Sequence, residues 1–165
     1  MSDDSIAHVS LAKGKLVDLE HSISNHQKAI QFTDDGDPKK PVYFANLGIS
    51  RQARYEGLGK LSDLQNSILS LKNSIQFSRN GDPGKPVYFS NIGLCQRLRY
   101  ECQGELAGLQ DSITNLQKAV QLSEDRNPAK PRILSTLGAI QMKRYLRLGE
   151  LASMEASLTN QRKAA

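Results

Sequence analysis

Residues 38–82 read PKKPVYFANLGISRQARYEGLGKLSDLQNSILSLKNSIQFSRNGD, and residues 83–127 match this stretch at about twenty of its 45 positions. The same spacing of 45 residues relates Gly48 to Gly93 and Gly138. A fixed period of this length is typical of helical-repeat proteins, in which similar units stack and share one continuous core. Such arrays usually bind other molecules. The period therefore indicates a binding scaffold, and it does not identify the ligand.

The period divides the chain into a partial unit at about residues 1–37 and three further units at 38–82, 83–127 and 128–165. We expect residues 1–165 to form a single repeat array. The first unit is short because residues 1–14 align only with the latter part of a first helix, so either the array begins with a partial cap or the sequence is a segment of a longer protein. Two polar residues, His26 and Gln161, replace the Leu71 of an inner unit, which is typical of capping units whose outer faces meet water.

The second half of each unit has the apolar spacing of a helix. Between residues 61 and 75, large apolar residues recur at intervals of three and four, which predicts one buried stripe on an α-helix. The residues are Leu61, Leu64, Ile68, Leu71 and Ile75. The pattern recurs in register in every unit, so the sequence predicts four copies of one amphipathic helix.

The first half of each unit is predicted to be a second helix. It begins at Pro41, which suits a first helical turn, and stops at Gly59, which suits a left-handed helix end. Glycine recurs at positions 14, 59, 104 and 149. Links such as DDGDPKKP, residues 34–41, are rich in turn-forming residues. The expected fold is all-α: a superhelix, or solenoid, of about four helical hairpins.

Composition excludes several functional classes. The 38% hydrophobic content includes no run of about 18 apolar residues, and the N-terminus lacks a signal peptide, so we expect a soluble cytoplasmic protein. Cys95 and Cys102 lie too far apart along one helix for a disulfide. Glycine-rich phosphate loops, metal-ligand spacings and nucleophile–base pairs are absent from the sequence, so we expect no catalytic, cofactor or metal site. The net charge of +5 favours acidic partners only mildly, because the basic residues are scattered among the acidic ones.

The repeat resembles the tetratricopeptide repeats. Phe44 precedes Leu47-Gly48 as the large apolar residue of that family precedes its Leu-Gly pair, and small residues such as Ser67 follow on the second helix. The string NLGISRQARYEGLGKLSDLQNSI, residues 46–68, is similar to the tandem tetratricopeptide-like arrays of fungal proteins. The period of 45 exceeds the family's 34 residues, and Tyr55 comes about one turn late.

The resemblance implies a concave groove lined by the first helix of each unit, in which a protein or peptide segment would bind. The residues expected there are Ala45, Asn46, Ile49, Gln52 and Glu56 in the first full unit, Asn91, Leu94, Arg97, Leu98 and Glu101 in the next, and Met142, Lys143 and Leu146 in the last. Positions in this stripe differ between the copies while scaffold positions recur. A groove that contacts different parts of one ligand would produce this variation, and so would drift on a solvated face.

Several alternatives remain open at this point. Asn46 and Asn91, with Arg97 and Lys143, could grip a carboxylate, as in family members that bind a peptide C-terminus. The array could instead be a structural spacer or a self-assembly module. RNA binding through the recurrent Arg54, Arg99 and Arg144 is a third possibility. We expect these arginines to be structural, with the Arg54 head paired to an acid such as Asp63.

Overall fold

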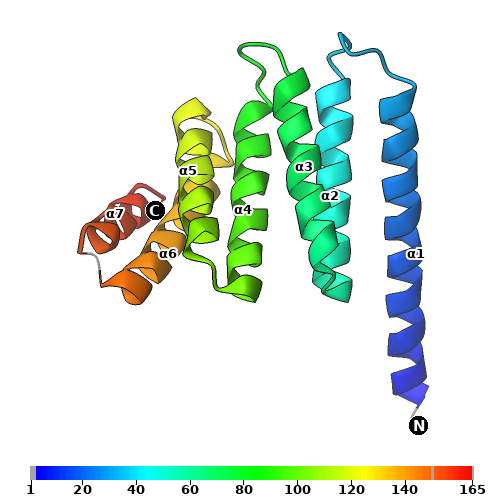
Figure 1. Ribbon diagram of the computed structural model, residues 1–165, viewed down its shortest axis with the longest axis horizontal. Helices are drawn as coiled ribbons and strands as arrows, with labels where there is room; N and C mark the ends of the chain where they lie inside the picture. The colour runs from blue at the N-terminus through cyan, green and yellow to red at the C-terminus, as the bar shows by residue number, and fades with distance from the viewer. Residues whose placement is uncertain (1–2, 150, 165) are drawn as a thin grey trace. The chain divides into compact units, whose positions relative to one another are not determined.

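The computed structural model describes residues 3–149 and 151–164, which contain seven α-helices and no β-strand. Contacts group the chain into two compact units, Met1–Ser78 and Arg79–Ala165. Unit 1 contains α1 (Asp3–Gln31), α2 (Lys40–Leu58) and α3 (Leu61–Phe77) (Figure 1). Unit 2 contains α4 (Lys85–Gln103), α5 (Leu106–Leu122), α6 (Lys130–Leu148) and α7 (Leu151–Ala164). The predicted all-α class is confirmed, and among the described residues no helix is both long and apolar enough to cross a membrane.

Three helical hairpins end their first helices as the glycine period predicts. Gly59, directly after α2, has a φ of 68°, and its N–H donates to the carbonyl oxygen of Tyr55 at 2.7 Å. Gly104 and Gly149 adopt the same left-handed conformation after α4 and α6. Glycine reaches this region without the steric cost of a Cβ. Each hairpin therefore reverses at a glycine, followed one residue later by the next helix.

The prediction of a fourth glycine stop was wrong. Gly14 lies inside α1, which runs unbroken through 29 residues. A glycine in a helix costs only about 1 kcal/mol, so a helix continues through it unless reversal gains packing. That packing partner is missing from the sequence before Gly14, because Ser10 and Asp3 occupy the positions of Tyr55 and Gly48. The described chain thus has one long helix and three hairpins in place of four hairpins.

Within each hairpin, the two helices are joined by a serine hydroxyl that donates to a glycine carbonyl. Ser67 Oγ donates to Gly48 O at 2.7 Å, and the pairs Ser112–Gly93 and Ser157–Gly138 repeat the bond at the same distance. A Cβ on Gly48 would lie 2.7 Å from Leu71 Cγ, so only glycine permits this approach. The resemblance-based prediction of close packing between Leu-Gly and small residues is confirmed for these positions.

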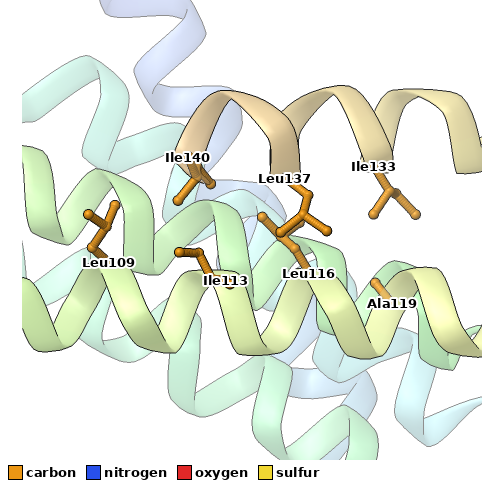
Figure 2. Packing of buried hydrophobic residues seen from close by; sticks show 7 residues of the cluster. All are labelled: Leu109, Ile113, Leu116, Ala119, Ile133, Leu137 and Ile140. Carbon is orange, nitrogen blue, oxygen red and sulfur yellow. The ribbon is translucent and has the colours of Figure 1, made fainter. Parts of the chain in front are cut away.

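The apolar stripes form the cores of the units. In unit 2, Leu109, Ile113, Leu116 and Ala119 on α5 face Ile133, Leu137 and Ile140 on α6 (Figure 2). These residues are almost fully buried. α5 therefore packs against α4 within its own hairpin and also against α6 of the next hairpin. In unit 1, Leu64, Ile68 and Leu71 on α3 are buried at the equivalent positions.

The links contain a lysine whose role was not predicted. Asp37 Oδ1 accepts from the N–H of Lys39 at 2.7 Å, as the turn-rich sequence predicts. In addition, Lys40 Nζ donates to Thr33 O at 2.7 Å and to Asp35 Oδ1 at 2.5 Å. Lys130 makes the equivalent bonds to Ser123 O and Asp125 in unit 2. The signal was present in the sequence, since a lysine precedes the helix-starting proline in all three links.

Candidate functional site

An ionic cluster joins the first helices α4 and α6 of unit 2. Arg97 Nη1 donates to both carboxylate oxygens of Glu101, at 2.8 and 2.9 Å, one turn along α4. Lys143 Nζ, on α6, donates to Glu101 Oε1. Two residues of the predicted groove, Arg97 and Lys143, are therefore brought together by Glu101, a third residue that was expected there. With two cations and one carboxylate, the cluster carries a net charge of +1.

The pKa of Glu101 reflects this cluster. Partial burial is the largest single influence, and it acts to raise the pKa. The hydrogen bond from Lys143 and the charges of Arg97 and Lys143 together outweigh it, so the pKa lies below its ordinary value. Glu101 is therefore ionised at neutral pH and already occupies both cations. The carboxylate clamp considered from the sequence would have to compete with it.

Apolar side chains flank the cluster on both helices. Asn91, Leu94 and Leu98 share a face with Glu101 because they precede it by ten, seven and three residues, and all three are half-buried. On α6, Met142 is half-buried and Leu146 is 74% exposed, one turn after Lys143. We call this set the α4–α6 surface: Asn91, Leu94, Arg97, Leu98 and Glu101 of α4, and Ala139, Met142, Lys143 and Leu146 of α6.

The predicted groove residues of α2 lie in unit 1 and are less uniform. Ala45 is 4% exposed and packs in the interior, so it lines no surface. Ile49 and Glu56 are exposed, while Asn46 and Gln52 are half-buried. Gln52 Nε2 donates to Glu56 Oε1 at 2.9 Å. Gln52 and Glu56 occupy the same repeat positions as Arg97 and Glu101. At these positions unit 1 therefore has an amide bonded to a carboxylate, whereas unit 2 has a guanidinium bonded to a carboxylate.

The recurrent arginines bind carboxylates of their own hairpins. Arg54 makes a bidentate pair with Asp63, at 3.0 Å from Nε and 2.5 Å from Nη2, and the predicted partnership is confirmed. Arg99 Nη2 lies 3.5 Å from Asp111 Oδ2. The hydrogen bond to Asp63 raises the pKa of Arg54 above its ordinary value. Pairing of this kind supports a structural role for Arg54 and Arg99.

Unit 2 contains clefts that were not predicted from the sequence, and Arg144 lines one of them. One cleft, of about 440 Å³, is lined by residues of α5, α6, α7 and the α5–α6 link: Val120, Asp125, Lys130, Pro131, Leu134, Asn160 and Lys163. A second, of about 350 Å³, lies between Gln117 on α5 and Thr159 on α7. Arg144 lines a third of about 230 Å³ with Leu106 and Leu148. The residues that line these clefts are outside the α4–α6 surface.

The side chains of the described residues offer no group of three or more His, Cys, Asp or Glu placed to hold a metal ion. Cys95 is buried and Cys102 is exposed, and no disulfide joins them, as expected from their spacing. No protein-family model matches the sequence, and a search of curated proteins finds no significant match.

Proposed function

We propose that this chain is a non-catalytic scaffold of the tetratricopeptide-like superhelical class, and that it binds a protein or peptide segment on the α4–α6 surface. The observation that supports this function most directly is the exposure of Leu146 beside a charged cluster that joins two helices. A large apolar side chain that is 74% exposed gains free energy when a ligand covers it.

The surface combines the two kinds of contact that peptide binding uses. Leu94, Leu98 and Leu146 offer apolar contacts for side chains of the ligand. Arg97, Lys143 and Asn91 offer hydrogen bonds along its rim and fix its orientation. The Glu101 bridges hold α4 and α6 in one geometry before a ligand arrives, which reduces the entropy cost of binding. Affinity at such a surface is typically micromolar, or about −8 kcal/mol.

A peptide-library selection tests the proposal. Peptides enriched on the wild-type chain are measured by fluorescence anisotropy against Leu146→Glu and against Leu69→Glu. Leu69 is 56% exposed on α3 and lies outside the α4–α6 surface, so it is a matched control. We expect Leu146→Glu to weaken binding about tenfold or more, because a charge replaces an apolar contact, and Leu69→Glu to leave it unchanged. Equal affinities for the two variants would place the binding elsewhere.

A further inference from the structure

The links that precede α2, α4 and α6 share one backbone arrangement. Each contains two consecutive turns, and each turn is closed by a backbone N–H that donates to the carbonyl oxygen three residues earlier. At 3.0 to 3.2 Å, the donor–acceptor pairs are Asp37–Asp34 and Lys40–Asp37, Asp82–Arg79 and Lys85–Asp82, and Asn127–Glu124 and Lys130–Asn127. The side chains at equivalent positions of the three links can therefore be compared directly.

In two of these links a lysine binds the aspartate five residues before it. Lys40 Nζ donates to Asp35 Oδ1 at 2.5 Å, and Lys130 Nζ donates to Asp125 Oδ1 at 2.7 Å. The link before α4 has Asn80 at the repeat position of both aspartates, five residues before Lys85. Lys85 is half-buried, and its ammonium group makes no hydrogen bond or ion pair with a described residue. This link thus has the cation of the bridge but an amide in place of the carboxylate.

The amide of Asn80 is placed where it can be converted to a carboxylate. Gly81 follows it, and none of the other eight asparagines precedes a glycine. Asn80 and Gly81 are exposed, and a Cβ on Gly81 would meet nothing within 4 Å, so the Gly81 nitrogen is unhindered. Seven of the other asparagines lie within helices, whose backbone N–H groups are bonded. Asn127 precedes Pro128, which has no N–H.

We propose that Asn80 deamidates spontaneously and that the aspartate product completes the missing bridge to Lys85. The backbone nitrogen of Gly81 attacks Cγ of Asn80 and loses its proton, and the side-chain amide nitrogen takes up a proton and leaves as ammonia. Water then opens the cyclic imide. Attack of water at Cγ breaks the new C–N bond and leaves aspartate at position 80, whereas attack at the main-chain carbonyl leaves isoaspartate. The net reaction consumes one water and releases one ammonia.

The aspartate product gives this link the charges that the other two links have. Its carboxylate stands five residues before Lys85, as Asp35 stands before Lys40, so the ammonium group gains a charged acceptor. The native acid of the link, Asp82, is engaged within the turn, because its Oδ1 accepts from the Gly84 N–H at 2.7 Å. Each deamidation also removes one unit from the net charge of +5.

Peptide mapping by mass spectrometry tests the chemistry. After the wild-type chain is held for days at mildly alkaline pH, the peptide that contains residue 80 should gain about 1 Da, faster than any peptide that contains another asparagine. Asn80→Gln should abolish the gain, because the longer side chain would have to close a six-membered ring. Gly81 is left unchanged, since its φ of 78° requires glycine. A wild-type peptide without this mass gain would overturn the proposal.

Urea unfolding tests the bridge. Asn80→Asp reproduces the aspartate product and should raise the folding equilibrium constant about two- to fivefold above that of wild type. In a Lys85→Met background the same substitution should give no increase, because the ammonium group is missing. Equal effects in the two backgrounds would show that no bridge forms. A deamidated wild-type chain that contains only isoaspartate would also overturn the proposal, because the bridge requires an unaltered main chain.

Discussion

At the scale of single residues, one repeat position illustrates how burial determines the contribution of an ion pair to stability. Arg54 and Arg99 are 45 residues apart, and each pairs with a carboxylate on the second helix of its hairpin. Asp63 is 2% exposed, whereas the side chain of Asp111 is 53% exposed. A buried carboxylate depends on its counter-charge because it has lost its hydration, whereas an exposed carboxylate keeps it.

We therefore expect Arg54→Ala to lower the free energy of unfolding by about 2 kcal/mol, a value reduced from the fully buried case because Arg54 itself is partly exposed. Arg99→Ala, its control at the same repeat position, should cost less than about 1 kcal/mol. Urea unfolding followed by circular dichroism measures both changes. Equal losses in the two variants would contradict the argument from burial.

Gly48 provides a second test at this scale. A Cβ there would meet Leu71 Cγ at 2.7 Å and the Ser67 carbonyl oxygen at 3.2 Å, so the hairpin helices would have to separate. We expect Gly48→Ala to destabilise the protein by about 1–3 kcal/mol. Gly57, also in α2, has open space around it, so Gly57→Ala should be neutral or stabilise by up to about 1 kcal/mol. Thermal unfolding of both variants checks the contrast.

At the scale of elements, identical glycine spacing gives two different outcomes. Gly59 ends α2 with a φ of 68°, whereas Gly14 lies within α1. Local sequence does not distinguish the two glycines, because each begins the same tripeptide. The two copies are Gly14-Lys15-Leu16 and Gly59-Lys60-Leu61. The difference lies in the preceding segment, because α2 has a packing partner in α3 and residues 3–13 lack the positions that make a hairpin.

Alanine substitution distinguishes the two roles. Gly14→Ala should stabilise α1 by about 0.5–1 kcal/mol and slightly increase helix content, because alanine is the better helix former. Gly59→Ala should destabilise by about 1–2 kcal/mol, because an L side chain is strained in the left-handed region. Far-UV circular dichroism with urea unfolding measures both. Destabilisation by Gly14→Ala would indicate a chain reversal at that residue.

At the scale of the whole molecule, pH links the Glu101 cluster to stability. The folded-state pKa of Glu101 lies below its ordinary value of 4.5, so the folded protein binds fewer protons than the unfolded chain. The stabilisation is fully present above about pH 4.5 and is lost as the pH falls through the lower, folded-state pKa. Since Glu101 is about one-third exposed, the effect should be at most about 1 kcal/mol.

We expect Glu101→Gln to reduce the loss of stability on acidification below about pH 4.5, measured as the urea midpoint across a pH series. Glu56→Gln is the matched control, because Glu56 has the same repeat position and bonds the neutral amide of Gln52. The control should change the pH profile less. An identical profile for Glu101→Gln and wild type would show that the cluster contributes nothing measurable.

The sequence alone determined the helices, because apolar spacing and left-handed glycines act locally and recur in register at positions such as Leu64, Leu71 and Gly59. It also indicated the Arg54–Asp63 pair and the absence of a disulfide between Cys95 and Cys102. Much of the predicted surface consists of half-buried or exposed residues, but Ala45 is buried, since exposure at a helix edge depends on what packs beside it.

Tertiary structure alone decided the rest. Glu101 became the centre of a cluster because α6 brings Lys143 to it across 42 residues of chain. Gly14 stays within α1 because the residues before it lack the positions that pack a hairpin, and the cleft beside Lys130 is lined by side chains from α5, α6 and α7. Helix-forming signals act between residues a few positions apart and can be read along the chain, whereas these features arise between residues that only the folded packing brings into contact.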